Sequence, residues 1–205
     1  QQQRQFIHDS VHPQFNGHCH FISAETPQEI AASVDYEVDV LINNDAYPAK
    51  RAQFQDITTE EFTETLDNLT VFPFTLTRLV VDKMRNKNKG KIVFITSAIP
   101  FRPPRNYASY VIARAATNSM AQVLAQELAE HNIQVNAVAP NFIESPTYFP
   151  PDLINDPKAY AKIIKPIPLK RLGTPEEPAH FVEFLVSSKA DYITGQVFPF
   201  AGGWV

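Results

Sequence analysis

The sequence KIVFITSAIPFRPPRNYASYVIAR at residues 91–114 decides the fold, because it joins a strand to a helix through a proline-rich loop. Residues 91–96 are almost continuously β-branched or aromatic, which is typical of a strand covered on both faces. A helix is expected from about residue 106 to 130, where apolar residues recur with a period of 3.6. A strand of this kind followed by a long helix predicts a parallel sheet with helical crossovers.

Shorter patterns on both sides of this unit continue the alternation of strands and helices. Apolar runs predict strands at residues 19–23, 38–43, 133–138 and 192–200, and the second of these has the composition of a buried strand. Helices are expected from Thr26, over 58–85, over 158–165 and from Thr174, where a capping threonine precedes a proline at the first helical position. Pro73 must kink the 58–85 helix or interrupt its hydrogen bonds. We therefore predict an α/β fold with one doubly wound parallel sheet of the Rossmann type, in a single domain over residues 1–205.

The composition is that of a globular domain, because 44% of the 205 residues are hydrophobic and 20% are charged. A net charge of -4 gives no basic surface for nucleic acid, no stretch has the length of a membrane span, and the opening QQQRQ is unlike a signal peptide. We expect a cytoplasmic protein whose partners are small molecules or copies of itself. The six glycines form no G-x-G-x-x-G turn, so the sequence carries no dinucleotide fingerprint.

Ligands of doubly wound sheets bind at the carboxyl ends of the strands, where three polar residues of this sequence are expected to meet. Ser97 follows the 91–96 strand, Tyr110 lies in the first turns of the next helix, and Arg114 lies one turn beyond Tyr110. A guanidinium beside a phenol stabilises the phenolate, so Tyr110 can act as a base near neutral pH. Ser97 can hydrogen-bond a substrate oxygen and hold it against Tyr110. Tyr107, on the same helix, has no cation four residues later.

Several motifs together resemble the short-chain dehydrogenase/reductase superfamily. They are INNDA at 42–46, IVFITSA at 92–98, Tyr110 with its cation four residues later, RLGTPEE at 171–177 and YITGQVFPFAGG at 192–203. In that superfamily the cation is ordinarily lysine and the strand after the catalytic helix ends in Pro-Gly, whereas this chain has Arg114 and Pro140-Asn141. These departures, with PNFIESPTYFP at 140–150, are similar to the halohydrin dehalogenases, a branch that keeps the fold and a Ser-Tyr-Arg triad but has a halide site in place of the nicotinamide pocket.

This resemblance implies a defined chemistry that needs no cofactor. Tyr110 would remove the hydroxyl proton of a vicinal halohydrin, and the alkoxide would displace halide to give an epoxide; in reverse, azide, cyanide or nitrite would open epoxides. Ser97 would bind the oxygen, Arg114 would stabilise the phenolate, and Asp45 is expected to interact with Arg114 and tune it or assist halide release. The resemblance also implies a homotetramer that packs through the two long helices. The residues implied to bind halide and substrate are Pro140, Asn141, Phe142, Ile143, Tyr148 and Phe149.

Two other functions stay open at this point. The opening strand-helix-strand unit of the superfamily is expected to precede residue 19 and is not in the sequence, so a nicotinamide-dependent reductase with a variant Tyr-x-x-x-Arg motif is one alternative. A non-catalytic relative is the other. Asn68 stands where ordinary dehydrogenases have a proton-relay asparagine and is given no role. The histidines and cysteine near the start match no zinc spacing, so no metal site is predicted; they are His12, His18, Cys19 and His20.

Overall fold

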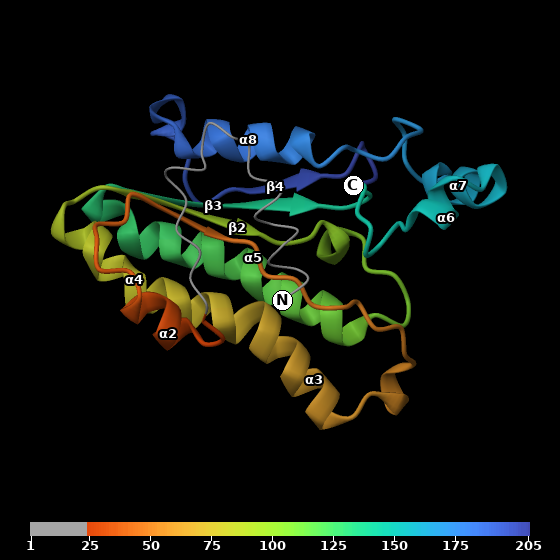
Figure 1. Cartoon of the computed structure of the whole chain (residues 1–205), viewed down its shortest axis with the longest axis horizontal. Helices are drawn as coiled ribbons and strands as arrows, with labels where there is room; N and C mark the ends of the chain where they lie inside the picture. The colour runs from red at the N-terminus through yellow and green to blue at the C-terminus, as the bar shows by residue number, and fades with distance from the viewer. Residues whose placement is uncertain (1–23) are drawn as a thin grey trace.

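The computed structural model describes residues 24–205, which form a four-stranded parallel sheet with helices on both faces (Figure 1). The strands follow one another across the sheet in chain order, which confirms the predicted Rossmann-like α/β fold. The strand predicted at 19–23 lies outside the described residues. The strands are β1 (Val40–Asn43), β2 (Gly90–Ile95), β3 (Ile133–Pro140) and β4 (Val197–Phe200).

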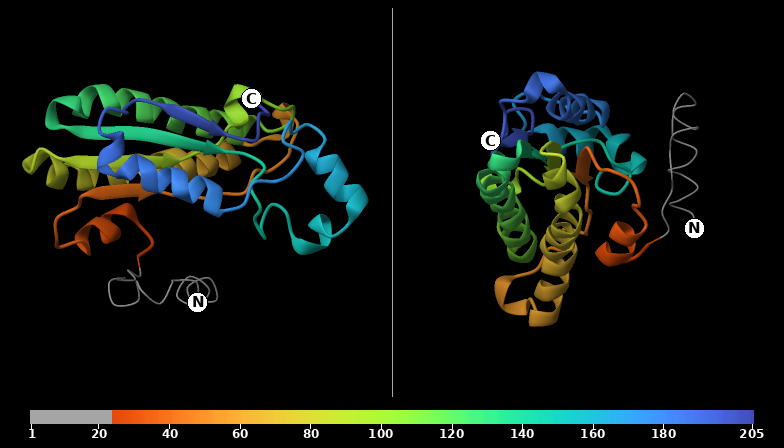
Figure 2. Two further views of the ribbon diagram at one scale, coloured as in Figure 1. Left: turned by 90° about the horizontal axis from the view of Figure 1, so that it is seen from above. Right: turned by 90° about the vertical axis from the view of Figure 1, so that its left-hand side faces the viewer.

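The helices form two layers, with α4 and α5 on one face of the sheet and α8 on the other (Figures 1 and 2). At the carboxyl ends of the strands, α6 and α7 stand away from these layers (Figure 2). No helix in residues 24–205 has both the length and the apolar composition needed to cross a membrane. The α-helices are α2 (Pro27–Ala32), α3 (Thr59–Leu66), α4 (Phe72–Asn86), α5 (Ala108–Leu128), α6 (Pro151–Ile154), α7 (Pro157–Ile164) and α8 (Glu176–Val186).

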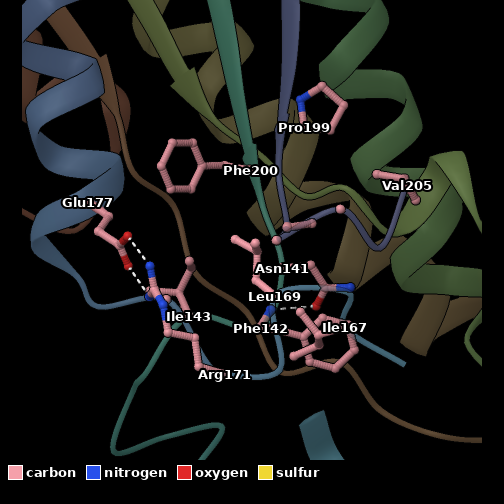
Figure 3. Close-up of a pocket in the computed structure, with 14 residues that line it drawn as sticks. Asn141, Phe142, Ile143, Ile167, Leu169, Arg171, Glu177, Pro199, Phe200 and Val205 are labelled. Atoms are coloured by element: carbon pink, nitrogen blue, oxygen red, sulfur yellow. Dashed lines mark hydrogen bonds and ion pairs between the residues drawn. The ribbon is translucent and has the colours of Figure 1, made fainter. Parts of the chain in front are cut away.

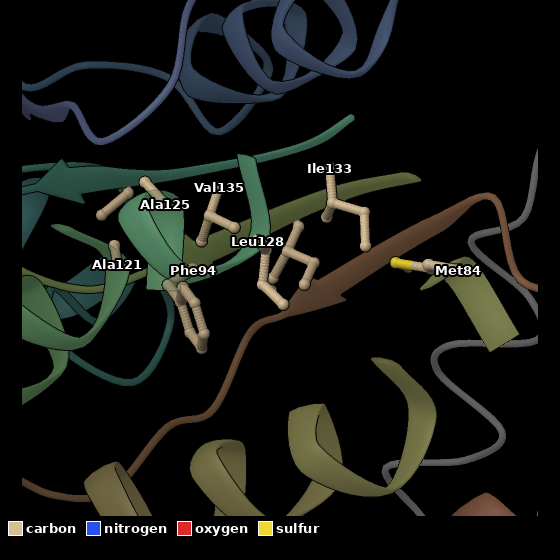
Figure 4. Close-up of a cluster of buried hydrophobic side chains, with 9 residues drawn as sticks. Met84, Phe94, Ala121, Ala125, Leu128, Ile133 and Val135 are labelled. Carbon is tan, nitrogen blue, oxygen red and sulfur yellow. The ribbon is translucent and has the colours of Figure 1, made fainter. Parts of the chain in front are cut away.

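The main core lies between the sheet and the layer of α4 and α5 (Figure 4). Phe94 and Val135 from the strands meet Ala121 and Leu128 of α5 and Met84 of α4, and each of the five is at most 8% exposed. Burying a side chain as large as Phe94 contributes about 1.5–3 kcal/mol. These contacts fix α5 against β2 and β3, and α5 carries two of the three predicted catalytic residues.

Two strands differ from the sequence prediction. The strand predicted as buried at 38–43 is β1, but Val40 is 37% and Ile42 46% exposed. Both side chains lie on the face of the sheet that α8 covers, and the main contacts of α8 are with β2 and β3. The strand predicted over 192–200 forms only at its end, as β4. Before it, Gly195 turns the chain at φ +70°, and the Asn136 side chain binds the backbone of that turn.

The helix predicted over 58–85 is interrupted in the way that Pro73 requires. A capping box of Thr58 and Glu61 begins α3, a single π-helical turn spans Asp67–Val71, and α4 follows. The start of α8 differs from its prediction: Pro175 occupies the capping position, and the Glu177 carboxylate accepts the Thr174 amide at 2.8 Å. The four-residue helix α6 was not predicted.

Candidate active site

Tyr110 and Arg114 lie side by side on α5, as their spacing of four residues predicts. Arg114 Nε donates a hydrogen bond to the Tyr110 hydroxyl at 3.3 Å, and the guanidinium carbon lies 5.4 Å from the centre of the tyrosine ring. Tyr110 is 9% and Arg114 5% exposed. A cation in such a poorly solvated position stabilises negative charge on the phenol oxygen more strongly than a cation at the surface.

The remaining nitrogens of Arg114 bind backbone carbonyls at the carboxyl ends of two strands. Nη1 donates to the carbonyl of Ile95 at 3.2 Å, and Nη2 donates to the carbonyl of Asp45 at 2.9 Å. Asp45 thus contacts Arg114 through its backbone, and among the described residues no hydrogen bond or ion pair joins its carboxylate to the guanidinium. Burial raises the pKa of the Asp45 carboxyl, and the charge of Arg114 partly opposes this shift. The guanidinium is therefore held in one position by three acceptors on different segments.

Ser97 lies just beyond β2 and is 6% exposed. Its hydroxyl oxygen accepts the Ile99 amide at 3.2 Å, and its backbone carbonyl accepts Asn118 Nδ2 at 3.4 Å. No hydrogen bond joins Ser97 to Tyr110 in the described part of the chain. Because the Ile99 amide occupies a lone pair of the serine oxygen, the hydroxyl hydrogen stays available to donate to a ligand.

The loop after β3 holds a strained backbone conformation beside the carboxyl end of the sheet. Phe142 has φ +58°, a left-handed conformation that costs about 1–3 kcal/mol for a residue other than glycine. The Asn141 side chain accepts the Phe142 amide at 3.0 Å. A short parallel bridge then joins Ile143 to Gly173, at a point where a side chain on Gly173 would lie 2.7 Å from the Ile143 side chain. The loop is therefore fastened to the segment that leads into α8.

Aromatic side chains cover this loop. The Phe142 ring lies 6.5 Å from Phe149 in a stacked arrangement and 5.5 Å from Trp204 in an edge-to-face arrangement. Tyr148, on the same loop, is 44% exposed. Burial raises the pKa of the Tyr148 phenol, the charge of Tyr110 raises it further, and Arg114 opposes the change. The Tyr148 hydroxyl is a hydrogen-bond donor on this loop.

Two cavities flank these residues. One of about 250 Å³ lies behind the loop, where Asn141, Phe142 and Ile143 form one wall and the ion pair of Arg171 with Glu177 lies at the side (Figure 3). The second, of about 100 Å³, is lined by Tyr110 and by residues of α3 and the 47–57 segment. The structure thus brings Ser97, Tyr110 and Arg114 to one end of the sheet, whereas none of the three lines the larger of these two cavities.

Sequence reasoning missed two polar residues next to this site, Thr117 and Asn118. Asn118 lies four residues after Arg114 and eight after Tyr110, so their common helical spacing is a signal that was available in the sequence. Asn68, which was given no role, uses its side-chain amide within its own helix, on the carbonyl of Glu64 at 2.8 Å. No cluster of metal-ligating side chains occurs in residues 24–205, and the histidines and cysteine near the start lie outside that range.

Comparisons with known proteins identify the family of the chain. The family profile described as enoyl-(acyl carrier protein) reductase matches residues 23–205. Dehydrogenase/reductase SDR family member 4 from Homo sapiens is 32% identical over 188 residues, which are 90% of this chain and 67% of that protein.

Two solved structures are more similar in sequence. One, described as a dehalogenation enzyme, is 42% identical with a TM-score of 0.90, over 100% of this chain and 84% of that one. The other, halohydrin dehalogenase (HheC) bound to ethyl (2S)-oxiran-2-ylacetate, is 37% identical with a TM-score of 0.84, over 88% of this chain and 75% of that one. The chain therefore belongs to the short-chain dehydrogenase/reductase superfamily of enzymes, and within it resembles the halohydrin dehalogenases.

Proposed function

We propose that this protein converts vicinal halohydrins into epoxides with release of halide, and that it opens epoxides with small anions in the reverse direction. The observation that carries the proposal is the position of Arg114. This cation contacts the Tyr110 hydroxyl directly, and its other two nitrogens are occupied by backbone carbonyls. These contacts hold the guanidinium against the tyrosine, where it can stabilise a phenolate.

The proposed reaction transfers one proton from the substrate to Tyr110 and exchanges one carbon–halogen bond for one carbon–oxygen bond within the substrate. The Tyr110 phenolate takes the proton of the substrate hydroxyl while Ser97 donates its free hydroxyl hydrogen to the same oxygen. That oxygen then forms a bond to the neighbouring carbon, the carbon–halogen bond breaks, and the halide leaves with its electron pair. The proton on Tyr110 passes to solvent. Arg114 stabilises the phenolate before the transfer and fixes the tyrosine ring during it.

The leaving halide needs hydrogen-bond donors, and the loop after β3 offers three. Among the described residues, the Ile143 amide and the Asn141 side-chain NH₂ group have no hydrogen-bond acceptor, and the Tyr148 hydroxyl is a third donor. The edges of Phe142 and Phe149 add weakly positive surface. With Pro140 and Ile143, these side chains form the proposed halide site.

The same residues do not fit a nicotinamide. Asn141 and Phe142 place two side chains directly after Pro140, where a flat ring would need close access to the backbone. Phe142 also occupies the adjoining space, since it packs against Phe149 and Trp204. Arg114, at the position of the superfamily lysine, is held by three protein acceptors, the Tyr110 hydroxyl and two backbone carbonyls at the strand ends.

Halide release from a small vicinal bromoalcohol at mildly alkaline pH, without nicotinamide, tests the proposal. We expect bromide and epoxide to form in equal amounts, and both to be lost in Arg114→Gln and Ser97→Ala. Arg78→Gln, on the exposed side of α4, is the matched control and should react normally. If the protein instead oxidises a nicotinamide in the presence of a ketone and releases no halide, the reductase function of its curated relatives replaces this proposal.

We further propose a homotetramer that packs through α4 and α5. Large apolar side chains on these helices are exposed in the single chain: Phe74 is 47%, Ile112 47% and Val123 54% exposed. Apolar surface of this extent on one helical layer is typical of an interface between subunits. Light scattering coupled to size exclusion should give four times the mass of one chain, and a monomer would contradict this arrangement.

A further inference from the structure

The break in the helix opposite α5 leaves one backbone carbonyl without its usual partner. In a regular helix the carbonyl of Leu69 accepts the amide of the residue four positions later, but that residue is Pro73, which has no N–H group. The π-helical turn at Asp67–Val71 lies at this point, and the Phe72 amide donates to Asp67, five residues back. Leu69 is 0% exposed, so water does not replace the missing donor.

Thr117 of α5 supplies that donor. Its hydroxyl lies 2.7 Å from the Leu69 carbonyl and 3.1 Å from the carbonyl of Ala113 in its own helix. A threonine inside a helix usually binds the carbonyl four residues back, and here the shorter bond goes to the neighbouring helix instead. The side chain is 2% exposed, so this bond forms where no solvent competes for it.

A second bond runs between the same two segments in the opposite direction. Thr70, next to Leu69, donates its hydroxyl to the carbonyl of Ala113 at 3.1 Å. The two bonds join the π-helical turn to α5 directly behind the Tyr110–Arg114 pair, because Leu69, Ala113 and Tyr110 form one buried cluster. Thr117 follows Tyr110 by seven residues, or about two turns, and so lies on the same side of α5.

We propose that Thr117 is a positioning residue for Tyr110 and Arg114. By binding the carbonyl that lacks its usual donor at Pro73, it fixes how far α5 slides along the α3–α4 segment. That position decides whether Arg114 reaches the carbonyls of the strand ends while it still contacts the tyrosine. The kinetic part of this inference rests on the proposed function, and the geometric part does not.

Removal of the Thr117 hydroxyl at constant shape tests the inference. We expect Thr117→Val to lower kcat for halide release about 10- to 100-fold, because small displacements of a catalytic group have effects of this size. KM should change little, since the halide loop is untouched, and the pH–rate profile should move to higher pH. Thr117→Ser keeps the hydroxyl and should retain most of the activity. Thr194→Val is the matched control, because the Thr194 hydroxyl oxygen accepts the Val135 amide at 3.0 Å near the amino end of β3, away from Tyr110.

A double-variant cycle with Pro73 sharpens the test. Pro73→Ala returns an amide four residues after Leu69. Thr117→Val should therefore lower kcat by a clearly smaller factor in the Pro73→Ala background than in the parent protein. A loss of the same size in both backgrounds would overturn the inference. So would normal kinetics in Thr117→Val, or a loss in Thr117→Ser as large as in Thr117→Val.

A substrate-free measurement separates this inference from the proposed function. The ultraviolet absorbance of ionised tyrosine is titrated in each protein and in its Tyr110→Phe version, all in a Tyr148→Phe background because the charge of Tyr110 acts on Tyr148, and the difference reports Tyr110. We expect the midpoint of this difference titration to move to higher pH in Thr117→Val and to stay in place in Thr194→Val. If the parent protein releases no halide, the proposed function has failed, and an unchanged midpoint in Thr117→Val would overturn the positioning role as well.

Discussion

The two sides of the candidate site are built in different ways. Ser97, Tyr110 and Arg114 rest on β2 and α5, and each is at most 9% exposed. The two helices that follow the proposed halide loop, α6 and α7, contain no buried side chain. The loop itself holds Phe142 in a strained backbone conformation. The layers of the fold thus fix the groups that we propose to move the proton, while a thinly packed segment carries the groups that we propose to receive the halide.

This difference assigns separate tasks to the two regions. Substitutions on the rigid side should change the rate of the reaction or the stability of the fold. Substitutions in the loop should change which halide or substrate binds, at little cost to stability, because few neighbouring side chains depend on the loop.

The largest effect is expected from Tyr110→Phe on the rigid side. Loss of the phenol oxygen removes the proton acceptor, and halide release should fall about 100- to 10,000-fold, the usual contribution of a catalytic base. The thermal midpoint should change little, because the ring keeps its packing. Tyr107→Phe, three residues earlier, is the matched control and should have normal activity. Activity in Tyr110→Phe close to that of the parent protein would exclude this tyrosine as the base.

A pair of phenylalanines then tests the contrast in stability. Phe94→Ala in the core should lower the free energy of unfolding by about 3–5 kcal/mol. Phe149→Ala in the loop should lower it by less than about 1 kcal/mol and should instead weaken halide binding, since its ring packs on Phe142. Urea unfolding and bromide inhibition of both variants check this. Equal destabilisation by the two changes would mean that the loop is part of the folding core.

The smallest effect concerns the ion pair that borders the loop. Hydrogen bonds from Arg171 lower the pKa of Glu177 to about 2, from its ordinary value of 4.5. A lowered pKa stabilises the folded state above the unfolded-state value, and this contribution is lost as the pH falls. Glu177→Gln should therefore be less stable than the parent protein at pH 7, and the difference should shrink between pH values of about 4.5 and 2. A constant difference in urea unfolding over this range would contradict the role of the ion pair.

The contrast between the regions also explains what the sequence could predict. The strand at 91–96, the helix around 106–130 and the Tyr110–Arg114 pair follow from periodicity and spacing, which are local properties. The carbonyls of Ile95 and Asp45 that bind Arg114 have no sequence signature, since every residue has a carbonyl. The exposure of Ile42 depends on how far α8 extends across the sheet, and the partner of Thr117 depends on a proline 44 residues earlier in the chain. Both are properties of tertiary packing.

Trp204 gives the protein an optical reporter of its own. It is the single tryptophan of the chain, its ring meets Phe142, and the Arg102 guanidinium lies 5.6 Å from its centre. Indole emission responds to the polarity and mobility of its surroundings and to heavy anions nearby. Ligand-induced movement of the loop can therefore be followed by fluorescence in the unlabelled protein, on the timescale of mixing, with one emitter and no background from other tryptophans.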